Sequence, residues 1–184
     1  MKAVMLSIQP KWCELIASGK KTIEVRKTAP KLQTPFKCYI YCTKDQYKRL
    51  VKDTPYGKVI GSGKVIGEFV CDYIKTFITD LGNISVHIES LKQTTLTLPE
   101  LITYSGNKSR VYGWHISDLK IYDTPKELRE FKRGCKKQPQ NCPFATWEYS
   151  QETEQDELQC CKKPRKITIT RPPQSYCYVE ELSE

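Results

Sequence analysis

The sequence predicts an α+β fold that is mostly β, with two or three short helices beside a small sheet. Three observations lead to this prediction. Short segments rich in β-branched and aromatic residues recur along the chain, turn residues separate them, and few segments have helical spacing. With 184 residues and 10% aromatic residues, the chain has the size and the bulky side chains for one core, so two large domains are not expected.

The first elements are a strand and a short helix. Residues 3–8 are mostly apolar and predict a strand. Pro10 suits the first turn of a helix because its missing N–H has no partner there. Leu15 and Ile16 share the inner face of this helix with Trp12, and Gly19 is typical of the position just after a helix end.

A second strand follows at residues 22–26, where polar and apolar residues alternate strictly. The alternation places Ile23 and Val25 on one face. The other face is polar and carries Thr22, Glu24 and Arg26.

The remaining elements are assigned by the same criteria. Helical stretches are expected from Thr97 through Tyr104 and from Thr124 toward Phe131, each with a proline near its start. Further strands are expected at residues 37–42, 59–60, 64–74, 111–121, 167–169 and 176–179.

The composition changes at residues 132–164, where charged residues dominate and hydrophobic periodicity nearly vanishes. We interpret this block as a polar insertion into a domain formed by residues 1–131 and 165–184. Its cysteines are spaced Cys-x6-Cys-x17-Cys-Cys, at Cys135, Cys142, Cys160 and Cys161. A structural zinc ion would explain how such a block folds, whereas free thiols are the alternative because neighbouring cysteines seldom bind one ion; no other cofactor is expected.

The net charge favours a polyanionic partner. Residues 1–92 contain 16 Lys and Arg against 8 Asp and Glu, which accounts for most of the net charge of +9. Such an excess is typical of nucleic-acid binding, although a solvated basic surface would look the same. No apolar run reaches the roughly 18 residues of a membrane span or resembles a signal peptide, so we expect a cytoplasmic protein with no membrane partner.

One segment has a specific charged pattern, Gly-x-Lys-x-x-Glu-x-Arg, formed by Gly19, Lys21, Glu24 and Arg26. The glycine lets the chain leave the helix sharply, and the charged side chains that follow are expected to converge. Cations can hold phosphates, and a carboxylate can orient the cations or accept from a base. The alternative is a surface ion-pair network that only stabilises the strand end.

With residues 9–16 before it, this segment resembles the ASCH domain family, relatives of the PUA-like RNA-binding β-barrels. The residues 67–70, residues 112–116 and a closing strand near Tyr176 support the resemblance, which covers about residues 1–125 and 165–180. It implies a small PUA-like mixed β-barrel with flanking short helices and a cleft beside Lys21, Glu24 and Arg26 that receives RNA or a nucleoside.

A second candidate for ligand contact is the segment that begins at Arg171. Two prolines make it stiff, and Arg171, Gln174 and Ser175 either present donors to a ligand or hydrogen-bond the rim of the barrel.

The leading functional hypothesis is therefore a module that binds RNA, another nucleic acid or a modified nucleoside in a basic cleft. Two alternatives stay open. Some ASCH proteins are similar to hydrolases that act on N4-acetylcytidine or on RNA; here Lys21, Thr22 and Glu24 would be the catalytic residues, although Glu24 stands where a threonine is expected. The other alternative is a protein-interaction module that uses residues 132–166.

Overall fold

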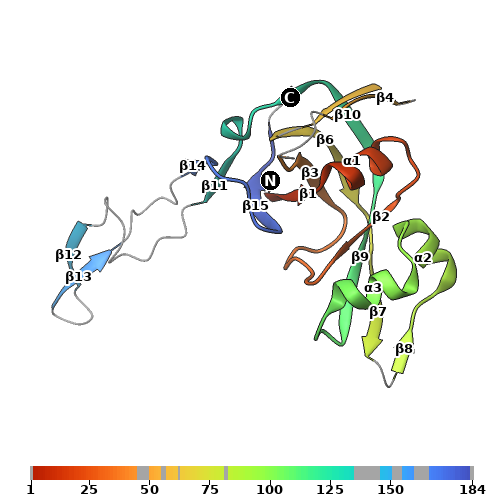
Figure 1. The fold of residues 1–184 in the computed structure, drawn as a ribbon. Helices are drawn as coiled ribbons and strands as arrows, with labels where there is room; N and C mark the ends of the chain where they lie inside the picture. Colours follow the sequence, from red (N-terminus) through yellow and green to blue (C-terminus); the bar gives the residue numbers. More distant parts are fainter. Residues whose placement is uncertain are drawn as a thin grey trace.

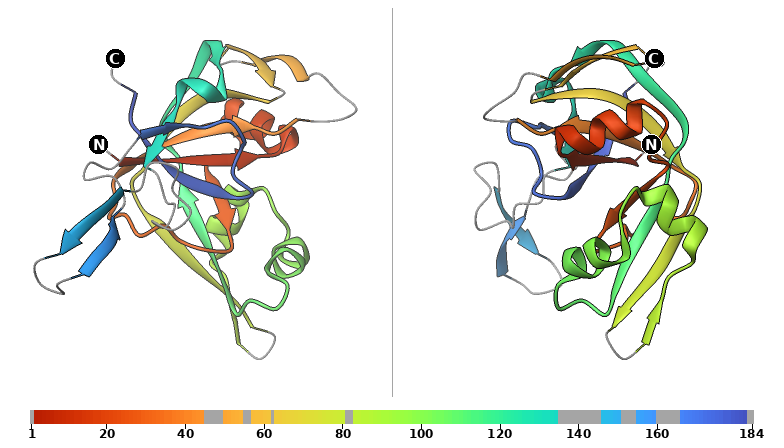
Figure 2. Two further views of the ribbon diagram at one scale, coloured as in Figure 1. Left: turned by 90° about the vertical axis from the view of Figure 1, so that its left-hand side faces the viewer. Right: turned by 45° about the vertical axis from the view of Figure 1, so that its right-hand side comes forward.

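The computed structural model describes residues 2–44, 50–54, 57–61, 63–80, 83–134, 146–150, 155–159 and 166–182. Most of the strand residues belong to two sheets, which are joined where the chain passes directly from a strand of one to a strand of the other (Figures 1 and 2).

The larger sheet has five strands in the order β10-β6-β3-β1-β15. They are β1 (Lys2–Ile8), β3 (Phe36–Cys42), β6 (Lys64–Cys71), β10 (Ser117–Lys126) and β15 (Tyr176–Glu180). The pair β1 and β3 is parallel, and the other pairs are antiparallel. Its central strands are buried almost throughout, so the sheet is covered on both faces.

The smaller sheet has four antiparallel strands in the order β2-β9-β7-β8. They are β2 (Ile23–Arg26), β9 (Arg110–His115), β7 (Ile74–Asp80) and β8 (Asn83–Ser85). Three short two-stranded sheets complete the described strands: β4 (Leu50–Thr54) with β5 (Gly57–Gly61), β11 (Lys132–Gly134) with β14 (Lys166–Thr168), and β12 (Thr146–Ser150) with β13 (Gln155–Gln159).

The helix α1 (Pro10–Ala17) confirms the prediction for the start of the chain. Pro10 occupies the first helical turn, and the helix buries Cys13 and Ile16 in the core of the larger sheet. Gly19 follows with a φ of 71°, which an L side chain rarely adopts. The chain therefore leaves the helix in a tight turn and enters β2 after a few residues.

Two further helices, α2 (Ile88–Thr94) and α3 (Leu98–Ser105), lie over one face of the smaller sheet (Figure 1). Leu101 of α3 packs in a cluster with Ile23 and Val25 of β2, Phe77 and Val111. A capping box between Thr97 and Glu100 begins α3, which confirms the helical stretch expected from Thr97. The apolar face of β2 is thus covered by helices.

Several expectations about strands and helices are wrong. Residues 64–74 and 111–121 do not form single strands, because β6 and β10 belong to the larger sheet while β7 and β9 belong to the smaller one. The helix expected from Thr124 is replaced by the end of β10 and a short 3₁₀ turn, η1 (Leu128–Glu130). Pro125 is compatible with β10 because this strand is at the edge of its sheet.

The described strands do not form a closed barrel, so the expectation of a small mixed β-barrel is met only in part. Among the described strands, the larger sheet ends at β10 and β15 and the smaller one at β2 and β8, and no ladder joins these edges. The chain instead passes from β9 to β10 at Ile116, which links two open sheets. The architecture is a sheet-rich mixed fold with a few helices.

The proposed insertion at residues 132–164 contains the β12 and β13 hairpin. Its cysteines Cys135, Cys142, Cys160 and Cys161 lie outside the described residues, so the zinc site stays a prediction. In the described ranges, no helix has both the length and the apolar character needed to cross a membrane.

Candidate nucleic-acid interface

The three charged residues of the Gly-x-Lys-x-x-Glu-x-Arg segment are buried. Lys21 is 2% exposed, and Glu24 and Arg26 are each 6% exposed. The turn at Gly19 brings Lys21 back against the helix, where its backbone N–H donates to Leu15 O at 3.0 Å. Because the apolar face of β2 lies under the helices, the polar face of the same strand must point to the interior between the sheets.

Glu24 lies between the two cations. Its Oε1 is 3.1 Å from Arg26 Nη2, and its Oε2 is 3.5 Å from Lys21 Nζ. We call these three residues the buried ion-pair network. Since a buried charge without a partner is costly, the network holds its members together more firmly than the exposed ion pairs that were the alternative.

The cations of the network also tie distant segments to β2. Lys21 Nζ donates to Thr94 O at 2.6 Å, at the end of α2. Arg26 Nη2 donates to Ser7 O at 2.8 Å, at the end of β1. Arg26 Nη1 lies 3.4 Å from Ser175 O and 3.5 Å from Ser175 Oγ, just before β15. The network therefore fixes where four elements meet.

Burial changes the protonation chemistry of Lys21. Loss of solvent lowers the pKa of Lys21 below its ordinary value, and the nearby Arg26 lowers it further, whereas Glu24 partly opposes the shift. The ammonium of Lys21 thus loses its proton more easily than that of an exposed lysine.

Two buried N–H donors beside the network lack an acceptor in the described part of the chain, Arg26 Nε and Trp114 Nε1. Glu24 is the register partner of Trp114 across β2 and β9, and Arg26 is the partner of Tyr112. Opposed side chains of an antiparallel pair share a face, so Arg26 and Trp114 are diagonal neighbours. Unpaired buried donors of this kind call for an acceptor from a ligand or from water.

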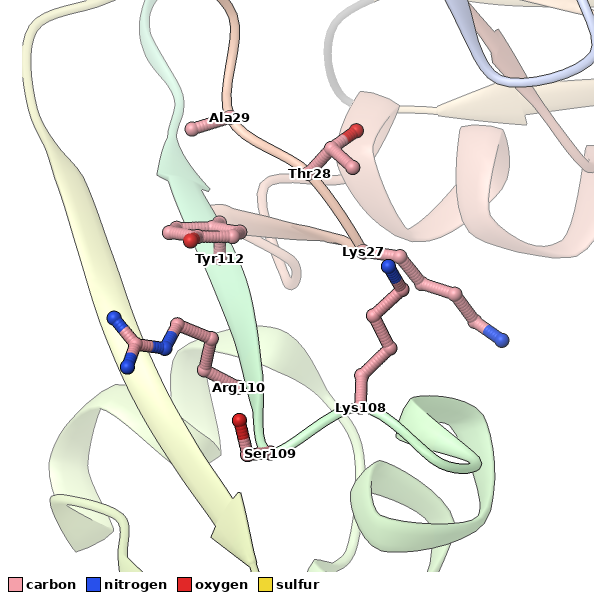
Figure 3. Close-up of a pocket in the computed structure, with 7 residues that line it drawn as sticks. All are labelled: Lys27, Thr28, Ala29, Lys108, Ser109, Arg110 and Tyr112. Atoms are coloured by element: carbon pink, nitrogen blue, oxygen red, sulfur yellow. The ribbon is translucent and has the colours of Figure 1, made fainter.

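An open hollow adjoins the network, with a volume of about 360 Å³. It is lined by Lys27, Thr28, Ala29, Lys108, Ser109, Arg110 and Tyr112 (Figure 3). We call it the basic hollow. Lys27 directly follows Arg26, and Tyr112 is the cross-strand partner of Arg26, so the hollow continues the polar face of β2 to the surface.

Figure 3 shows Lys108 and Arg110 on two sides of the ring of Tyr112, whereas the side chain of Lys27 points away from it. Lys108 extends toward the Lys27–Thr28 segment, and Arg110 lies on the other side of the ring. The Lys27 ammonium is held 5.3 Å from the centre of the Tyr104 ring. None of the lining residues in the described part of the chain carries a carboxylate.

Of the other predicted site residues that the structure describes, one contacts the buried ion-pair network and the others do not. Ser175 reaches the network through Arg26. Arg171 and Gln174 are exposed, and no hydrogen bond or ion pair among the described residues connects them to it. Thr22 is half-buried and binds its neighbours through the backbone, where Thr22 N donates to Gln93 O at 3.1 Å and Thr22 O accepts from Ile116 N at 2.8 Å.

The residues that line the basic hollow were not predicted from the sequence. A signal was present for Lys27, which extends the charged pattern by one residue. The residues 108–110 are far from it in the chain, and only the pairing of β2 with β9 brings the two segments together. That pairing is a long-range contact that no local pattern predicts.

Comparison with known proteins finds a match to the ASCH domain family model over residues 6–170. The crystal structure of ASCH from Zymomonas mobilis is similar with a TM-score of 0.50 and 19% identity, covering 68% of this chain and 73% of that chain. The crystal structure of a tyrosine-to-phenylalanine mutant of the Zymomonas mobilis protein is similar with a TM-score of 0.49 and 19% identity, and the match covers 70% of this chain and 77% of that chain. At this identity the likeness concerns the fold alone.

One curated protein, eupatolide synthase from Helianthus annuus, is 30% identical over 77 residues. The match covers 40% of this chain and 16% of that protein. This chain therefore corresponds to a small part of that protein, and its activity is not transferred.

Proposed function

This chain belongs to the ASCH domain family, a PUA-like family often linked to RNA binding, and we propose that it is a module that binds RNA at the basic hollow, which adjoins the buried ion-pair network. The observation that carries this proposal is a hollow beside Arg26 that is lined by Lys108, Arg110 and the Lys27 segment and, among the described residues, by no carboxylate. Uncompensated cations in a concave surface attract phosphates.

In this proposal the network is the framework of the site rather than its contact surface. Glu24 neutralises part of the charge of Lys21 and Arg26 and fixes their positions. The network anchors β2 (Ile23–Arg26), which Lys27 directly follows and which pairs with β9, so the hollow has a rigid support. The hydrogen bonds from Arg26 to Ser7 and Ser175 extend this support to β1 and to the start of β15.

Fluorescence anisotropy with a labelled single-stranded RNA of mixed sequence tests the proposal. We expect binding at low salt, and we expect the double variant Lys108→Glu with Arg110→Glu to abolish it. The matched control is Lys2→Glu, an exposed lysine at the far end of β1 from Ser7. Absence of RNA binding by the wild type, or equal loss in the control, would contradict the proposal.

One observation favours the hydrolase alternative. The lowered pKa of Lys21 suits a lysine that takes up a proton during catalysis. The hydroxyl of Thr22 has no hydrogen bond to Lys21 or Glu24 among the described contacts. Because Lys21 is 2% exposed, a substrate would have to break the hydrogen bond from Lys21 to Thr94 O to reach it. Incubation with N4-acetylcytidine followed by chromatography tests it, since turnover that is lost in Lys21→Ala would support a hydrolase.

A further inference from the structure

We infer that the basic hollow recognises a terminal phosphate, that is, a phosphomonoester on a nucleotide, either free or at the end of an RNA strand. The inference rests on the proposed function because it names the chemical group that the same site reads. It goes beyond a general attraction to the RNA backbone, since a phosphodiester carries less charge and fewer free oxygens than a phosphomonoester.

The charges of the hollow favour a dianion. Lys108 and Arg110 line one hollow together with Lys27, whose ammonium turns toward Tyr104, and none of the described lining residues carries a carboxylate. Like charges at one hollow repel one another, and one negative charge relieves this repulsion only in part. A terminal phosphate carries about 1.5 to 2 negative charges near neutral pH and three acceptor oxygens.

The donors of the hollow also match such a group. Arg110 offers a planar guanidinium that can bind two phosphate oxygens at once, and Lys108 offers a compact ammonium. The hydroxyls of Thr28 and Ser109 are further donors at the wall. These groups outnumber the two free oxygens of a single phosphodiester.

The size of the hollow indicates more than a bare phosphate. Its volume of about 360 Å³ is near the lower end of the roughly 300–1,000 Å³ of small-molecule sites. The ring of Tyr112 and the methyl group of Ala29 provide an apolar part of the wall (Figure 3). A sugar or base can pack there while the attached phosphate meets the cations.

The segment that carries two of the cations is held in place before any ligand arrives. Thr79 is 3% exposed; its backbone N–H donates to Ser109 O at 2.9 Å, and its hydroxyl donates to Lys108 O at 3.0 Å. The backbone N–H of Lys108 donates to Ser105 O at 3.2 Å. A site whose backbone is fixed in this way loses little entropy on binding.

The test compares short single-stranded RNAs of one sequence that end in a 5′-phosphate, a 3′-phosphate or only hydroxyl groups, by anisotropy with the full chain. We expect a terminal phosphate at one of the ends to tighten binding about tenfold. Lys108→Gln and Arg110→Gln should each remove most of that preference, whereas Lys2→Gln should preserve it. Cytidine monophosphate should compete, and cytidine should not.

Failure of the inference and failure of the proposed function give different results. If all three RNAs bind equally and cytidine monophosphate does not compete, the hollow does not read a terminal phosphate, but the module still binds RNA. If no RNA binds while cytidine monophosphate binds by calorimetry and Lys108→Gln weakens it, the phosphate site stands and the RNA proposal fails. If neither binds, both are overturned.

Discussion

Arg26 Nη2 lies 3.1 Å from Glu24 Oε1, and both side chains are 8% exposed. This pair is therefore buried together with Lys21, which approaches the other oxygen of the same carboxylate. A single anion thus serves two cations in the interior, and its removal leaves both without an ion-pair partner in the described structure.

We expect Glu24→Gln to destabilise the fold by about 3–5 kcal/mol, the usual cost of leaving a buried charge uncompensated. Urea unfolding measures the change in the free energy of unfolding. The control is Glu89→Gln, which breaks an exposed pair with Lys92 in α2 and should leave stability unchanged within error. Equal effects of the two variants would contradict a structural role for the buried ion-pair network.

Stability should also depend on the protonation of Lys21. Because burial lowers the pKa of Lys21 in the folded state below the ordinary value of 10.5, the unfolded chain binds more protons at this site between the two values. The free energy of unfolding should therefore rise with pH across this interval and level off above 10.5.

Urea unfolding of the wild type and Lys21→Met at a series of alkaline pH values checks this expectation. The difference in the free energy of unfolding between the two proteins isolates the contribution of Lys21, because the tyrosines and the other lysines titrate in both. The wild type should gain stability relative to the variant as pH rises through the interval. A difference that stays constant with pH would show that Lys21 has the same pKa folded and unfolded.

The order of strand, helix and strand at the start of the chain could be predicted because local signals agree there. Pro10 begins α1, Gly19 follows it with positive φ, and the residues of β2 alternate strictly. The burial of β2 on both faces could not be predicted, because alternation normally indicates one solvated face. What covers the polar face is Ser7 and Ser175, from segments far apart in the sequence.

The helix α2 was missed for a related reason. Its buried residues Ser90 and Thr94 are polar, whereas Ile88 is 69% exposed, so no apolar stripe marks it. Likewise, the apolar runs at 64–74 and 111–121 are continuous in sequence although the chain changes sheets within each of them. Periodicity identifies strands but does not say which sheet a strand joins.

Gly113 in the middle of β9 should be sensitive to substitution. An added Cβ would lie 2.6 Å from Phe77 Cε2 and 2.7 Å from Ile23 Cγ2, which is closer than side chains can pack. We expect Gly113→Ala to lower the free energy of unfolding by about 1–3 kcal/mol through overpacking. Urea unfolding measures it, with Gly134→Ala as the control because nothing lies within 4 Å of a Cβ there.

The salt dependence of RNA binding should become weaker each time a cation of the basic hollow is removed. Each phosphate contact with a single strand contributes about 0.7 to the slope of log Kobs against log salt, because bound counterions are released. Replacing Lys27, Lys108 or Arg110 by Gln should thus each reduce the slope by about 0.7, and the triple variant by about 2. Anisotropy titrations over a range of salt concentrations give these slopes.

Lys2→Gln should leave the slope unchanged, since Lys2 lies at the other end of β1 from the network. Parallel lines for the wild type and the triple variant would mean that RNA does not meet the hollow, even if it binds elsewhere on the protein.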